Sequence, residues 1–98
     1  MTIYLRKFGT LLFSREAGRE AFAALNTQLS ELKNDDDLEV DFEGVITFSP
    51  SWGDEFLTPL IKKYGNRVFF INTKDNPSVK ATLELLTDIN KAYFQIKP

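Results

Sequence analysis

The chain contains neither cysteine nor histidine. The absence of cysteine excludes disulfides and thiolate metal sites. The absence of histidine removes the usual general base at neutral pH, and with it zinc sites and Ser-His or Cys-His nucleophilic pairs. Because two of the commonest catalytic side chains are missing, we expect a protein that is not an enzyme and that carries no metal or cofactor.

The chain also lacks a large excess of positive or negative charge, and it has no long apolar run. Twelve Lys and Arg against fourteen Asp and Glu give a formal net charge of −2, which provides no general attraction to nucleic acid or anionic lipid. No apolar run approaches the ~18 residues that span a bilayer. Arg6 and Lys7 interrupt the first segment, which does not fit a signal peptide. We therefore expect a cytoplasmic protein with neither a nucleic-acid nor a membrane partner.

Aromatic residues, by contrast, are plentiful. The sequence of 98 residues has nine Phe, three Tyr and one Trp, and so many large rings predict a compact core. The length is that of one ordinary domain. Because no repeat, low-complexity tract or Pro/Gly-rich linker divides the chain, we expect residues 1–98 to form a single domain.

Two hydrophobic periods alternate along the chain. Apolar residues at helical spacing predict three helices, which cover about 14–33, 50–64 and the segment that begins at 76–77. Short β-prone runs lie before, between and after them, at 2–8, 38–42, 45–48, 68–71 and 92–96. The run 68–71 is apolar throughout, the pattern of a strand covered on both faces. The alternation predicts a two-layer α/β sandwich with a mixed or mostly parallel sheet.

The loop that leads into the second predicted helix carries the most chemistry. A helix start presents free backbone N–H groups, which suit an anion or a phosphoryl group. Ser49 and Ser51 both lie at this start. A purely structural interpretation is also open, in which Ser49 is the N-cap and Ser51 forms a capping box with Asp54.

Residues on both sides of this loop follow the pattern of a known family. That pattern is a strand ending in Asp-Phe, a Gly, a short β run, two Ser around one residue, an aromatic, a small residue and Asp-Glu. The matching residues are Asp41, Phe42, Gly44, Ser49, Ser51, Trp52, Gly53, Asp54 and Glu55. A second match, near the N-terminus, comprises Phe8, Gly9, Leu12, Ser14 and Arg15. On these two segments the chain resembles the STAS-like domain family of unknown function, relatives of the sulfate-transporter and anti-sigma-factor-antagonist domains.

The resemblance implies a regulatory domain that binds a protein partner. Classical antagonist relatives dock on an ATP-binding, kinase-like anti-sigma factor and are switched by phosphorylation of a Ser at this helix start. Pro50 stands at the position of that Ser, between Ser49 and Ser51. We expect a non-catalytic domain that docks its partner through residues 49–55, with five contact or switch residues: Ser49, Ser51, Trp52, Asp54 and Glu55.

Arg15 and Arg19 share one face of the first predicted helix, one turn apart. They could hold a small anion, which gives a second class of function: a domain that binds a nucleotide or another anion at Arg15 and the helix start at Ser49. The alternative is an ion pair between Arg15 and either Asp41 or Glu43. We favour the ion pair because Arg–carboxylate pairs are common structural ties.

Two further residues allow more than one interpretation. Trp52 is either an exposed anchor for a partner or a ring packed against Phe48. Asp41 lies among apolar strand residues, but a single carboxylate is weak evidence for catalysis, so we assign Asp41 and Gly44 to the structure of the loop. No base, oxyanion hole or metal set can be assembled from the spacing. The edge of the first strand also offers a route to a homodimer.

Overall fold

The computed structural model of this chain describes residues 1–33, 35–90 and 95–96. Its elements alternate between strands and helices, as the sequence predicts. In chain order they are β1 (Thr2–Tyr4), the 3₁₀ helix η1 (Leu5–Phe8), β2 (Leu11–Leu12), α1 (Arg15–Leu29), β3 (Leu38–Asp41), β4 (Thr47–Phe48), α2 (Pro50–Tyr64), the 3₁₀ helix η2 (Gly65–Arg67), β5 (Val68–Ile71), α3 (Pro77–Asn90) and β6 (Gln95–Ile96).

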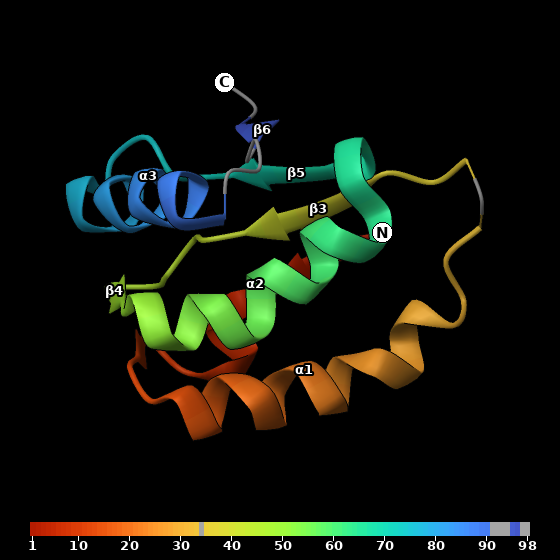
Figure 1. The fold of residues 1–98 in the computed structure, drawn as a ribbon, viewed down its shortest axis with the longest axis horizontal. Helices are drawn as coiled ribbons and strands as arrows, with labels where there is room; N and C mark the ends of the chain where they lie inside the picture. The colour runs from red at the N-terminus through yellow and green to blue at the C-terminus, as the bar shows by residue number, and fades with distance from the viewer. Residues whose placement is uncertain (34, 91–94, 97–98) are drawn as a thin grey trace.

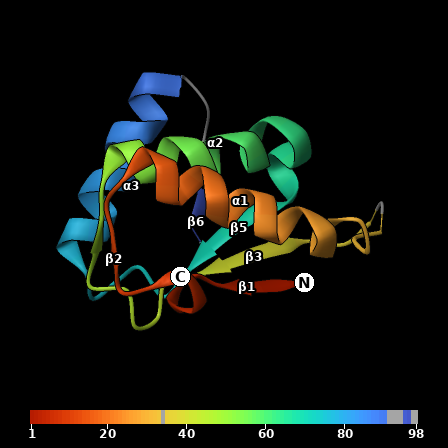
Figure 2. The same ribbon diagram turned by 90° about the horizontal axis from the view of Figure 1, so that it is seen from below.

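The strands form a four-stranded sheet of order β1-β3-β5-β6 and a two-stranded ribbon of β2 and β4. All the strand pairs are parallel. The strand order of the large sheet follows the chain, so right-handed crossovers place the connecting helices on the same face. Figures 1 and 2 show this arrangement, with α1, α2 and α3 on one side of β1, β3 and β5. The predicted α/β fold with three helices and a mostly parallel sheet is confirmed.

Short polar side chains set where the helices begin. Ser14 Oγ accepts the Ala17 N–H at 2.9 Å at the start of α1, and Asn76 Oδ1 accepts the Val79 N–H at 3.1 Å at the start of α3. These bonds satisfy backbone donors that have no partner inside the helix. The predicted starts are confirmed, but α1 ends at Leu29 rather than near residue 33.

The strands depart from the predictions in three places. Only the first three residues of the segment 2–8 form a strand, because Leu5–Phe8 turns into a 3₁₀ helix. Phe69 and Ile71 of β5 are only half-buried, so the expectation of a strand covered on both faces is wrong, since the helices cover one face. The ribbon strand β2 was not predicted. Of the expected strand 92–96, residues 95–96 lie in β6 and 92–94 fall outside the described residues.

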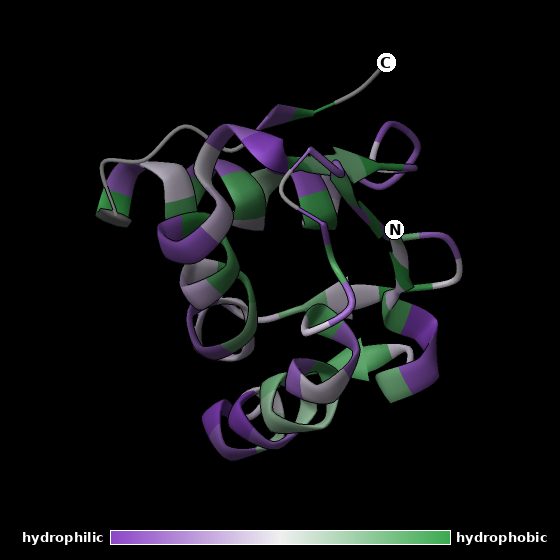
Figure 3. Ribbon diagram, turned by 90° about the vertical axis from the view of Figure 1, so that its right-hand side faces the viewer, coloured by the Kyte–Doolittle hydropathy of each residue, from purple (hydrophilic) through white to green (hydrophobic). Residues whose placement is uncertain are grey.

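One hydrophobic cluster lies between the sheet and the helices. It draws buried side chains from all three helices and from strands β1 to β5. The hydropathy colours in Figure 3 follow this layering, with largely green strands and helices that alternate green and purple bands. In the part of the chain described, no helix is long and apolar enough to cross a membrane.

Candidate functional site

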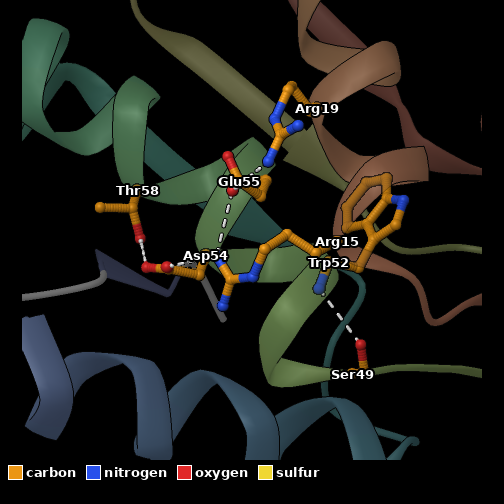
Figure 4. A network of polar contacts seen from close by, with 7 residues as sticks. All are labelled: Arg15, Arg19, Ser49, Trp52, Asp54, Glu55 and Thr58. Atoms are coloured by element: carbon orange, nitrogen blue, oxygen red, sulfur yellow. Dashed lines mark hydrogen bonds and ion pairs between the residues drawn. The ribbon is translucent and has the colours of Figure 1, made fainter.

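The start of α2 is built around the hydroxyl of Ser49. Ser49 Oγ accepts the Trp52 N–H at 3.1 Å (Figure 4). The same hydroxyl donates to the carbonyl oxygen of Phe13. The Ser49 N–H donates to the carbonyl of Leu12 at 2.8 Å. The N-cap interpretation of Ser49 is therefore confirmed, and the same side chain fastens β2 to the helix start.

Ser51 lies inside the first turn of α2, two residues after the cap. A capping box requires its first residue at the N-cap, so the predicted box of Ser51 and Asp54 is wrong. The Asp54 carboxylate instead accepts bonds from Thr58 Oγ1 at 3.1 Å and Arg15 Nη1 at 3.0 Å. Ser51 itself is half-buried and keeps some contact with solvent.

Trp52 is a core residue. Its side chain is 1% exposed, its ring stacks on Phe56 with centroids 4.7 Å apart, and it meets Phe48 edge to face at 6.4 Å. The interpretation of Trp52 as an exposed anchor is wrong, and the alternative of packing against Phe48 is confirmed. The reason is the helical period, which turns the third residue of α2 toward the sheet and the facing helix.

Two arginines of α1 meet two carboxylates of α2. Arg15 Nη1 lies 3.0 Å from Asp54 Oδ2 and 3.1 Å from Glu55 Oε1, and Arg19 Nη2 lies 3.4 Å from the same Glu55 oxygen (Figure 4). The hydrogen bond from Arg15 lowers the pKa of Glu55. The bonds to Asp54 and Glu55 likewise raise the pKa of Arg15. Because two positive charges face two negative ones, this cluster has no excess charge to attract an anion.

The preferred sequence interpretation of Arg15 named the wrong carboxylates. Asp41 lies at the end of β3, where its Oδ1 accepts the Glu43 N–H and Asn72 Nδ2, each at 2.8 Å. Glu43 Oε2 lies 3.8 Å from Nη1 of Arg6. Arg15 points to α2 instead, because α1 packs against α2 and brings Gly18 close to Trp52 and Glu55. The structural role assigned to Asp41 is confirmed.

Gly44 turns the chain after β3 and has a φ of +84°. This left-handed conformation is costly for residues with a Cβ atom. The structure therefore agrees with the assignment of Gly44 to the loop, where a side chain would also meet Arg6.

Sequence reasoning missed three exposed apolar residues close to the start of α2. Leu11, Phe13 and Ile46 are 55%, 54% and 62% exposed. Leu11 and Phe13 are alternate residues and emerge on the same face of the chain, while Leu12 between them is buried. The Ile46 N–H donates to the carbonyl of Thr10 at 2.9 Å. The run Leu11–Phe13, with three apolar residues in a row, was a signal of this exposure. A strand with one buried face buries only alternate residues, so the outer two apolar side chains are left to face solvent.

We call the combined surface of Leu11, Phe13, Ile46, Ser51 and Asp54 the docking surface. Of its apolar part, Leu11 lies in β2, Phe13 directly follows β2 and Ile46 directly precedes β4, while its polar part lies in the first turns of α2. The bond from Ser49 to Phe13 and the pair of Arg15 with Asp54 hold the two parts together. Such a surface, partly apolar and partly polar, can bind another surface.

The described residues contain no group of three or more Asp and Glu side chains that could hold a metal ion. The five residues expected at the site thus divide by role. Ser49 and Trp52 build the helix start, whereas Ser51, Asp54 and Glu55 remain at least partly exposed. No family model, no curated protein and no solved structure matches this chain.

Proposed function

We propose that this domain is a non-catalytic regulatory module that binds a protein partner through the docking surface. The observation that carries the proposal is that Leu11, Phe13 and Ile46, three large apolar residues in or next to the β2–β4 ribbon, are each more than half exposed. Exposed apolar residues that gather in one place are typical of interaction sites, whereas scattered ones need no explanation. Aromatic side chains such as Phe13 are enriched at the centres of interfaces.

The polar part of the docking surface gives it specificity for a partner, which an apolar patch alone does not provide. Asp54 and the neighbouring Arg15 are a third to a half exposed, and charges at the rim of an interface favour the correct partner and suppress wrong ones. The resemblance to antagonist-type domains supports the same location, because their partner docks at this helix start. A kinase-like partner and a cytoplasmic location belong to this proposal.

A phosphorylation switch would act through Ser51 rather than Ser49. The Ser49 hydroxyl is engaged twice, with Phe13 and Trp52, so its modification would break the cap and the link to β2. Ser51 is half-buried but not tied into the cap. A phosphate there adds a charge of about −1.5 to −2 beside Asp54, which would weaken docking by an acidic partner surface and favour a basic one.

The test is a quantitative comparison of partner capture from the protein's own host. Tagged wild-type chain, Phe13→Asp and Ile89→Asp are recovered in parallel, and their partners are measured by mass spectrometry. Ile89 is 60% exposed and lies near the C-terminal end of α3, and it is not part of the docking surface. Its substitution is therefore a matched apolar-to-charged control. Circular dichroism confirms that each variant is folded.

We expect one or a few proteins to be recovered with the wild type and with Ile89→Asp and to be lost with Phe13→Asp. The reconstituted pair should show the same order of affinities by calorimetry. Equal recovery with Phe13→Asp would contradict the proposed surface. Recovery of the chain alone in every case would contradict the partner-binding function.

A further inference from the structure

The strand β1 lies at an edge of the large sheet and pairs with β3 on one side only. Its register with β3, and the bond from the Glu39 N–H to the Met1 carbonyl at 2.8 Å, turn the backbone groups of Ile3 toward β3. The backbone groups of Thr2 and Tyr4 therefore point away from the sheet. Within the described residues, the Thr2 N–H, the Thr2 carbonyl and the Tyr4 N–H have no protein partner. Such a row of groups is a template for one more strand.

The usual protection of an exposed edge is missing from β1. Proteins blunt such edges with charged side chains, proline, bulges or very short strands, or they cover the edge with another segment. The three residues of β1 are Thr, Ile and Tyr, which favour strands and carry no charge. In the described part of the chain, no other strand pairs with their free side. Apart from its shortness, this edge is therefore open to a strand from outside.

A pocket of about 110 Å³ lies along the same edge, between β1, η1 and α1. Its apolar lining consists of Ile3, Phe8, Ala24 and Leu25. A dry cavity of about 150 Å³ holds a benzene molecule, so this pocket has room for one aliphatic side chain. Side chains of a strand alternate between its two faces, and one residue of an added strand would point into the pocket. Main-chain pairing together with a pocket for alternate side chains is how sheet edges recognise extended peptides.

The position of α1 favours a lone peptide segment over a second copy of this chain. In Figure 1 the N-terminus, where β1 begins, lies between β3 and α1, so α1 projects past the free edge. A second copy that paired its β1 antiparallel about a twofold axis would carry its own α1 past the same edge on the same face. Each α1 would then run into the helices of the other protomer. An extended segment without a helical layer meets no such obstacle.

We infer that the β1 edge binds an extended peptide segment of a partner protein, which adds a strand to the sheet. The segment donates to the Thr2 carbonyl and accepts from the N–H groups of Thr2 and Tyr4, and one aliphatic side chain enters the pocket against Leu25. Lys7 is the one charged residue that the described chain places in the lining, and it disfavours a basic residue there. None of the residues of the docking surface lines this pocket, so it is a second, separate interaction site.

Nuclear magnetic resonance with the ¹⁵N-labelled full chain tests the site directly. The probes are five-residue peptides, capped at both ends, in which threonine alternates with valine, isoleucine or leucine. We expect saturable shifts of the Ile3, Tyr4 and Ala24 amide signals with at least one of these peptides, and slower solvent exchange of the Tyr4 N–H. No saturable shift with any of the three, or shifts confined to other parts of the chain, would overturn the inference.

Two methylated isomers of the binding peptide test the main-chain pairing. Alternate amides of an added strand face β1 and the others face solvent, and a methyl group on an amide nitrogen removes its donor. Methylation of the amides that face β1 should weaken binding about tenfold or more, whereas methylation of the other amides should have a much smaller effect. Equal affinities of the two isomers would mean that the peptide backbone is not recognised.

Two variants locate the binding and one serves as a control. Thr2→Pro removes an edge donor at the first residue of a strand, where proline is tolerated, and Ala24→Arg places a long side chain in the pocket. Each should weaken the peptide about tenfold or more, with circular dichroism showing that it is folded. Ala23→Arg, the same change at an exposed position outside the lining, should leave the affinity unchanged. Equal affinity of Ala24→Arg and Ala23→Arg would overturn the assignment.

Sedimentation equilibrium tests the competing occupant of the edge. We expect the wild type and Thr2→Pro to sediment alike, because a second copy does not pair at β1. A dimer of the wild type that Thr2→Pro dissociates would show that a second copy occupies the edge, and it would overturn the inference of a partner's peptide segment.

Discussion

Arg15 is bonded to two carboxylates of the neighbouring helix at once. Its Nη1 reaches Asp54 at 3.0 Å and Glu55 at 3.1 Å, and all three side chains are a quarter to a half exposed. Solvent screens ion pairs at such positions, and their contribution to stability is small. The value of the cluster lies in orientation, because it fixes the position of Asp54 in the docking surface.

The altered pKa of Glu55 predicts a pH dependence of stability. The bond from Arg15 lowers this pKa in the folded chain, relative to about 4.3 in the unfolded chain. The stabilisation by Glu55 is therefore present above that unfolded value and is lost as the pH falls through the folded value. In urea unfolding, the difference between wild type and Glu55→Gln should be largest near neutral pH and shrink below about pH 4.

A double-mutant cycle isolates the cause of this effect. Repeating the comparison in an Arg15→Gln background removes the hydrogen bond that lowers the pKa of Glu55 most. The pH dependence of the Glu55→Gln effect should then shrink. An unchanged dependence in that background would mean that Arg15 is not its source.

At the scale of the elements, α1 and α2 approach closely at Gly18. A Cβ atom at this position would lie 2.6 Å from the carbonyl oxygen of Trp52 and 3.2 Å from Cβ of Glu55. Backbone atoms cannot rotate away as a flexible side chain can. This contact is therefore what sets Arg15 and Arg19, on either side of Gly18, within reach of the α2 carboxylates.

Gly18→Ala should reverse the usual effect of this substitution. In an unhindered helix, alanine is more stable than glycine by about 0.8–1.0 kcal/mol. At Gly18 the clash with Trp52 forces the helices apart, and we expect a net loss of about 1–3 kcal/mol in the free energy of unfolding. Ala23→Gly, at an exposed position of the same helix, measures the ordinary difference. A stabilised Gly18→Ala variant would show that α1 and α2 are not in close contact.

The elements that sequence reasoning predicted well are those with local signals. Ser14, Ser49-Pro50 and Asn76-Pro77 mark helix starts within two residues, and all three are confirmed. The ribbon of β2 and β4 has no such local signal, because the residues that pair across it, such as Leu11 and Thr47, lie 36 positions apart in the chain. The 3₁₀ helix η1 also has no local signal, because the alternating pattern that predicts a strand continues through its residues.

The candidate site could be located but not resolved in detail from the sequence. The segment 49–55 does form a helix start, but the exposure of each ring depends on what packs against it. Trp52 meets Phe48 and Phe56, whereas Phe13 lies past the end of its ribbon strand and stays exposed. The partners of Arg15 depend on which helix crosses α1. Such contacts are set by tertiary packing, which neither spacing nor composition specifies.

At the scale of the whole molecule, one core joins the sheet and the helices. Buried residues from α1, α2, α3 and strands β1 to β5 form a single cluster. The central helix α2 packs against both α1 and α3 (Figure 1). A Cβ atom added at Gly53 of α2 would lie 2.6 Å from Cδ1 of Leu86 in α3 and 2.8 Å from Cε2 of Phe48 in β4, so the three elements pack closely here. A chain with one core of this kind should unfold in one cooperative step.

The single Trp makes this cooperativity measurable. Trp52 fluorescence reports on the core beside α1 and α2, while far-ultraviolet circular dichroism reports on all helices and strands. The two urea transitions should coincide in the wild type. Leu86→Ala, which removes a buried side chain of α3 that is 1% exposed, should destabilise by about 2–5 kcal/mol. It should move both transitions by the same amount, although Trp52 lies on another helix. If the circular dichroism transition moved while the fluorescence transition stayed in place, α3 would be an independently unfolding unit and the single core would not act as one.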